Sequence, residues 1–90
     1  YVFHFIEALA RAGEAAGLEP AMAMRLARQT LIGAAALAAQ DGATPPATLR
    51  ERVTSPGGTT AAGLSVLMPG LTPLMEQVIA AAAARSKALG

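Results

Sequence analysis

Residues 31–39 read LIGAAALAA, a stretch with no polar side chain. They continue a helical pattern that begins near Pro20, because proline suits a first helical turn. The pattern ends near Gln40, ahead of a predicted exit at Asp41-Gly42. The first half of this helix is amphipathic, but residues 31–39 are apolar on every side. A helix that is apolar all round must be covered all round, so this stretch predicts extensive packing against something else.

The fold class predicted for the whole chain is all-α. Apolar residues recur at spacings of three and four and nowhere alternate over the length of a strand. We predict five helices, of which two are long and one is short, without an internal repeat. Gly17 ends the first helix, and Thr44-Pro45 caps the short third helix. The fourth helix is predicted to break at Pro69-Gly70, and Thr72-Pro73 to open the last one.

Composition excludes several classes of protein. The chain has 90 residues, of which 53% are apolar and 14% charged, so intrinsic disorder is excluded. It contains no cysteine, which rules out disulfides, thiolate metal sites and a thiol nucleophile. We expect no metal site of any kind. The formal net charge is +1 and the basic residues are scattered, so nucleic acid is not expected as a partner.

Much of the apolar fraction is alanine, which removes little area from water when it is buried. A chain this short and rich in alanine has difficulty covering both residues 31–39 and the alanine run at residues 80–84. We therefore expect a partner surface, either a further domain or a second copy. An obligate dimer or larger assembly is the prediction.

Two apolar stretches are candidates for a membrane span. Residues 29–39 are too short to cross a bilayer, and residues 71–84 carry Glu76 and Gln77 in their middle. We expect neither to span, and no membrane partner. The opening at Tyr1 lacks the basic region of a signal peptide, which favours a cytoplasmic protein. That opening is already amphipathic and uncapped, so we expect the chain to be part of a longer protein.

Residues 53–60 read VTSPGGTT and carry the only pattern that suggests chemistry. They lie between a predicted helix end and a predicted helix start, where the N–H groups of Gly58, Thr59 and Thr60 would be unpaired donors. The loop has several hydroxyls but no Lys or His, so it suits a small carboxylate better than a phosphate. The simpler alternative is a threonine N-cap after a tight turn, which would need only one hydroxyl.

This loop and its flanks resemble the signature of pyrroline-5-carboxylate reductase, the last enzyme of proline biosynthesis. The resemblance rests on Leu49-Arg50-x-x-Val53-Thr54-Ser55-Pro56-Gly57-Gly58-Thr59-Thr60-x-x-Gly63-Leu64. Residues 1–18 also look like the start of the family's C-terminal helical domain, and the resemblance extends over essentially all of residues 1–90. The sequence departs from the family at residues 44–46, where a His-Pro step is usual, and at residues 68–71, where the family has a charged turn.

The resemblance implies that residues 1–90 form a helical dimerisation and substrate-binding domain, intertwined with a second copy. It implies a homodimer, which in this family often assembles further into a decamer. NADPH or NADH would be bound mainly by an N-terminal Rossmann domain, and this chain has no G-x-G-x-x-G and no strand to carry one. The full-length enzyme would reduce the imine 1-pyrroline-5-carboxylate to L-proline, whereas this chain alone would be inactive.

The resemblance also implies roles for individual residues. The backbone at Gly58, Thr59 and Thr60, together with Ser55, would hold the substrate carboxylate, and Val53 would pack on the substrate ring. Thr60 would be the catalytic residue, placed nearest the ring nitrogen as a hydrogen-bond donor and proton source. The implied substrate-binding residues are Val53, Ser55, Gly57, Gly58, Thr59 and Thr60.

Two alternatives belong to other functional classes. A helical homo-oligomerisation module without small-molecule binding would explain residues 31–39 and make the loop an ordinary turn. An amphipathic membrane-surface domain would require clustered lysines and bulky aromatic residues on one face. This chain has only one lysine, Lys87, and 3% aromatic residues.

Overall fold

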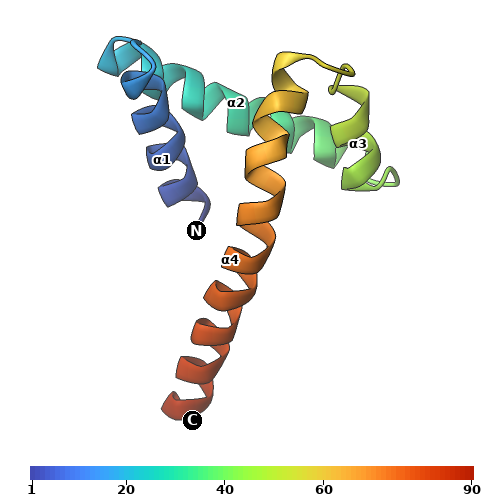
Figure 1. The fold of residues 1–90 in the computed structure, drawn as a ribbon. Coiled ribbons are helices and arrows are strands. Elements are labelled where there is room, and N and C mark those ends of the chain that lie inside the picture. The colour runs from blue at the N-terminus through green and yellow to red at the C-terminus, as the bar shows by residue number, and fades with distance from the viewer. The chain divides into compact units, whose positions relative to one another are not determined.

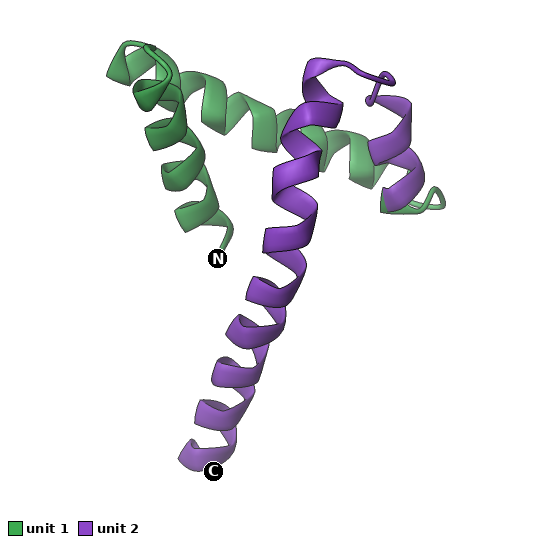
Figure 2. Cartoon of the chain, viewed as in Figure 1, with its two compact units in different colours: residues 1–46 green, residues 47–90 purple.

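The computed structural model describes residues 1–90 as four helices without a strand (Figure 1). They are α1 (Val2–Ala15), α2 (Pro20–Gln40), α3 (Pro46–Arg52) and α4 (Thr59–Leu89). The predicted all-α class is confirmed. The chain divides into two compact units, Tyr1–Pro46 and Ala47–Gly90, which are coloured separately in Figure 2.

In the first unit, α1 ends in a Schellman turn. The Gly17 N–H donates to the carbonyl oxygen of Glu14 at 2.9 Å, and the Leu18 N–H donates to that of Gly13 at 3.0 Å. Gly17 has a φ of 109°, a left-handed conformation that glycine adopts without a steric penalty. The predicted end of the first helix at Gly17 is confirmed.

A side-chain cap and a proline together define the start of α2. The carboxylate of Glu19 accepts hydrogen bonds from the N–H groups of Ala21 at 3.1 Å and Met22 at 3.2 Å. Pro20 occupies the first helical position. An N–H at this position would have no partner within the helix, so its absence in proline costs no hydrogen bond. The predicted start at Pro20 is therefore confirmed, and the cap is supplied by Glu19.

The contact between α1 and α2 is built from very small residues. Ala10, Ala23 and Ala27 are each 3% exposed and are the buried residues of the structure. Gly13 faces α2 so closely that a Cβ there would lie 3.4 Å from the Ala23 Cβ and 3.2 Å from the Leu18 Cδ1. Small side chains let the helices approach each other, but they bury little apolar area.

Large apolar side chains therefore remain on the surface of each unit. In α2, Ile32 is 57% exposed and Leu31 is only half-buried. No residue of α4 is buried, and its Val66 is 77% exposed. The structure thus leaves residues 31–39 and most of α4 without the cover that their composition requires.

The prediction of five helices was wrong at Pro69-Gly70. Pro69 and Pro73 both lie inside α4, which continues as one helix of 31 residues. Each proline lacks the N–H that would donate to the carbonyl four residues earlier, on Ser65 and Pro69 respectively. A proline inside a helix costs about 3 kcal/mol, but the intact hydrogen bonds on either side still propagate the helix. Thr72 is accordingly a mid-helix residue and not a cap.

The predicted cap of the third helix was also wrong. Thr44 donates its hydroxyl to the Asp41 Oδ1 at 2.7 Å, and its N–H to the Asp41 carbonyl oxygen at 3.0 Å. Thr44 therefore closes the turn after α2, because that acceptor lies within reach of its short side chain. The third helix begins at Pro46.

Uninterrupted, α4 is about 46 Å long at 1.5 Å per residue. By length and composition alone it could cross a membrane, since one 18-residue window has a mean hydropathy of 1.3 and none of that window is buried within the chain. The apolar stretch of residues 71–84, with Glu76 and Gln77 in its middle, lies within this longer helix. That it does not span a membrane stays a prediction.

Replacing either internal proline tests the continuity of α4. Pro69→Ala and Pro73→Ala should each raise the free energy of unfolding by up to about 3 kcal/mol, because each restores one backbone donor and removes a ring clash. Thermal and denaturant unfolding measure the change. Pro20→Ala is the matched control, since it lies at a first helical position and should shift stability by about 0.5 kcal/mol or less. A less stable Pro69→Ala variant would instead show that the folded state needs a break near Pro69.

Candidate functional site

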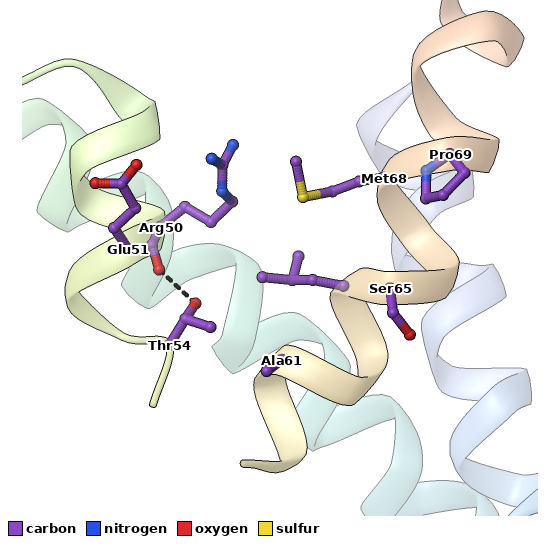
Figure 3. A pocket seen from close by; sticks show the side chains of 8 residues that line it. Arg50, Glu51, Thr54, Ala61, Ser65, Met68 and Pro69 are labelled. Atoms are coloured by element: carbon purple, nitrogen blue, oxygen red, sulfur yellow. Dashed lines mark hydrogen bonds between the residues drawn. The ribbon is translucent and has the colours of Figure 1, made fainter. Parts of the chain in front are cut away.

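The candidate site begins where α3 ends. Thr54 closes that helix twice, with its N–H donating to the Glu51 carbonyl oxygen at 3.1 Å and its hydroxyl donating to the Arg50 carbonyl oxygen at 2.6 Å. Figure 3 shows the second bond as a dashed line. These bonds satisfy two of the carbonyls that the end of a helix leaves without a partner.

The chain then makes a tight turn from Ser55 to Gly58. The Gly58 N–H donates to the Ser55 carbonyl oxygen at 3.0 Å, with Pro56 and Gly57 between them. Gly57 has a φ of 71°, so Pro56 and Gly57 fit the second and third positions of a type II turn. Gly57 therefore supplies the left-handed backbone that this turn requires.

Gly58 must be a glycine for a different reason. Its φ of −84° and ψ of −177° are open to any residue. A Cβ at this position, however, would lie 3.2 Å from the Ser55 carbonyl oxygen and 3.4 Å from the Ser55 Cβ. The two glycines therefore act differently, because Gly57 permits the turn and Gly58 permits the close approach of its two ends.

Gly58 is also the N-cap of α4, and no side chain caps this helix. The alternative of a threonine N-cap is therefore wrong. No hydrogen bond within the chain uses the N–H groups of Thr59 and Thr60, which belong to the first helical turn. The Gly58 N–H, which the sequence analysis counted among the unpaired donors, is instead taken by Ser55 in the turn.

The hydroxyls of the loop also fall into two groups, those that are hydrogen-bonded within the chain and those that are not. Thr54 is half-buried and its hydroxyl is used by Arg50. The hydroxyls of Ser55, Thr59 and Thr60 are on exposed residues and make no hydrogen bond within the chain. The N-terminus of α4 and the turn before it thus offer backbone donors, hydroxyls and the positive end of the helix dipole together. This combination suits a small anion.

Every residue predicted for the site lies on this loop or on the first turn of α4. Val53 follows directly on α3 and is 62% exposed, so its side chain is open to contact with a ligand. The residues in question are Val53, Ser55, Gly57, Gly58, Thr59 and Thr60.

A cavity of about 380 Å³, which no sequence motif indicates, lies between α3 and α4. In Figure 3 the Arg50 side chain extends from α3 toward this opening, and Met68 and Ser65 stand on the α4 side. Arg50 is half-buried and makes no ion pair within the chain. The cavity is lined by Arg50, Glu51, Thr54, Ala61, Leu64, Ser65, Met68 and Pro69.

The sequence is similar to known proteins over nearly its whole length. Residues 1–89 match the pyrroline-5-carboxylate reductase dimerisation family. A pyrroline-5-carboxylate reductase of Arabidopsis thaliana is 49% identical over 84 residues, which make up 91% of this chain and 30% of that protein. The enzyme of the same name from Synechocystis sp. is 45% identical over 91 residues, covering 100% of this chain and 34% of that protein.

The fold is similar as well. A crystal structure of Plasmodium falciparum pyrroline carboxylate reductase with NADP bound superposes with a TM-score of 0.89 and 34% sequence identity. The superposition covers 100% of this chain and 34% of that one, so the chain spans about a third of the length of these relatives. The family match includes all four helices and the loop between α3 and α4. This chain belongs to the pyrroline-5-carboxylate reductase dimerisation family.

Proposed function

We propose that this chain is the dimerisation and substrate-binding domain of an enzyme that reduces 1-pyrroline-5-carboxylate to L-proline. The observation that carries the proposal is the start of α4, where a glycine N-cap leaves the N–H groups and hydroxyls of Thr59 and Thr60 without partners in the chain. In a member of this family, such a start suits the carboxylate of the substrate.

The loop residues divide the work of binding. The N–H groups of Thr59 and Thr60 and the hydroxyl of Ser55 donate to the substrate carboxylate. Gly57 and Gly58 hold the turn tight, because Gly57 takes the left-handed position and Gly58, without a Cβ, leaves room for Ser55. The tight turn lets the carboxylate reach the start of α4. Val53, which is exposed beside the turn, packs on the substrate ring.

Thr60 acts at the reacting bond. When bound, a nicotinamide cofactor, NADPH or NADH, would supply a hydride to the carbon of the C=N bond, and the ring nitrogen would take its proton from the Thr60 hydroxyl, which water then reprotonates. The Thr60 hydroxyl donates a hydrogen bond to that nitrogen as its charge changes.

The cofactor is held mainly by a domain outside these residues. This chain consists of four helices and has neither the strand nor the G-x-G-x-x-G turn of a dinucleotide site. The nucleotide in the Plasmodium relative and the longer chains of the relatives support this arrangement. On this proposal the 90-residue chain has no reductase activity by itself.

A second copy of the chain covers the exposed apolar surface. The family match names dimerisation, and the alanine-rich faces of α2 and α4 allow close contact between helices. We infer that a second copy of the chain, and not a lipid bilayer, covers the apolar surface of α4. A dimer of this kind is consistent with a cytoplasmic enzyme. Assembly of dimers into a decamer and the absence of membrane and nucleic-acid partners stay predictions.

Sedimentation at micromolar concentration tests the dimer. We expect no folded monomer, because residues 31–39 and α4 lack cover within one chain. Flotation with lipid vesicles forms the second arm, in which the chain should stay unbound. A stable monodisperse monomer, or a chain that floats with vesicles, would contradict the proposed partner.

Substitution of Thr60 in the full-length enzyme tests the reaction. Thr60→Ala keeps the backbone donor but removes the hydroxyl, and should reduce transition-state stabilisation by roughly 2–4 kcal/mol. Thr60→Ser should recover most of the turnover. The melting temperature should change little in both variants, because Gly58 and not a threonine is the N-cap. Normal turnover with a lowered melting temperature in Thr60→Ala would give this residue a structural role only.

A further inference from the structure

We propose that Thr54 is a positioning residue, whose hydroxyl holds the carboxylate loop in its binding geometry before the substrate arrives. The inference rests on the proposed function, because it concerns the same loop. Thr54 itself is not among the residues assigned to contact the substrate. It acts through Ser55, Gly58 and the first turn of α4.

The first step is the anchoring of Thr54 to α3. Its hydroxyl donates to the Arg50 carbonyl oxygen at 2.6 Å, and its N–H donates to the Glu51 carbonyl oxygen at 3.1 Å. Thr54 is half-buried, whereas its neighbours Val53 and Ser55 are exposed. A hydrogen bond sheltered from water is less readily replaced by bonds to solvent, so this bond fixes the point where the loop leaves the helix.

The second step carries this anchoring to α4. The residue after Thr54 is Ser55, whose carbonyl oxygen accepts the Gly58 N–H at 3.0 Å. Ser55 and Gly58 are in close contact, because a Cβ on Gly58 would lie 3.2 Å from that same oxygen. Gly58 is the N-cap, so its hydrogen bond to Ser55 links the end of α3 to the first turn of α4, where Thr59 and Thr60 lie.

The third step concerns the cost of binding. A loop that is ordered before the ligand binds does not lose backbone entropy on binding, whereas a loosened loop does. Loss of the Thr54 hydroxyl should therefore weaken substrate binding and raise KM. It should leave kcat nearly unchanged, because no atom of Thr54 is placed at the reacting bond. Loss of the Thr60 hydroxyl should instead lower kcat and leave KM nearly unchanged.

The chain contains a matched control in Thr30. The Thr30 hydroxyl donates to the Leu26 carbonyl oxygen at 2.7 Å, which is the same type of bond to a residue four positions earlier. Thr30 lies inside α2, so no loop depends on it. Valine at either position keeps the β-branched shape and removes only the hydroxyl.

Steady-state kinetics of the full-length enzyme tests the proposal. Thr54→Val should raise KM for 1-pyrroline-5-carboxylate about two- to tenfold, the effect of one lost hydrogen bond. Its kcat should change by less than about twofold, and Thr54→Ser should restore KM. Thr30→Val should leave KM unchanged. An unchanged KM in Thr54→Val, an equal rise in Thr30→Val, or no recovery in Thr54→Ser would overturn the proposal.

Hydrogen exchange of the same full-length proteins gives a measurement that does not need activity. The two hydrogen-bonded amides of this segment, those of Thr54 and Gly58, should exchange faster in Thr54→Val than in the parent protein and in Thr30→Val. If the parent protein fails to reduce the imine, the proposed function is wrong, and the exchange rates still decide whether Thr54 orders the loop. Equal exchange in all three proteins would overturn the positioning role.

Discussion

Contact between α1 and α2 is made by alanine and glycine, and the rest of the structure follows from that constraint. Ala10, Ala23 and Ala27 are buried, and Gly13 lies so close to α2 that a side chain there would touch Ala23. Such an interface brings two helices together without removing much apolar surface from water. The large apolar side chains must therefore find cover outside the chain, which is the physical basis of a dimerisation domain.

The candidate site and much of this uncovered surface belong to the same helix. The N-terminus of α4 carries Thr59 and Thr60, while its later turns present residues such as Val66 and Ile79 on the surface. A helix whose position is fixed by a partner also fixes the donors at its end. In the proposed enzyme, dimerisation would thus help to hold the substrate loop, in addition to the anchoring of that loop by Thr54.

Conformation was predictable where a residue changes the backbone angles that are open to it, because glycine widens the range of φ and proline narrows it. Gly17 ends α1 and Pro20 begins α2, as their sequence contexts predicted. The same type of signal failed at Pro69 and Pro73. There the loss of a hydrogen bond and a ring clash are local costs, and the uninterrupted turns on both sides outweigh them.

By itself, the sequence determined the all-helical class, the family and the loop that carries the candidate site, because these depend on residue types at fixed spacings. Only the tertiary structure decided which residues are buried, because the contact of α1 with α2 covers Ala10, Ala23 and Ala27. Hydrogen-bond partners also became visible only in the folded chain, although they lie three or four residues apart in the sequence. Folding brings Asp41 within reach of Thr44, gives the Gly58 N–H to Ser55, and gives the Thr54 hydroxyl to Arg50. A serine, threonine or backbone N–H can bond to many acceptors, and only the folded chain determines which of them lies within about 3 Å.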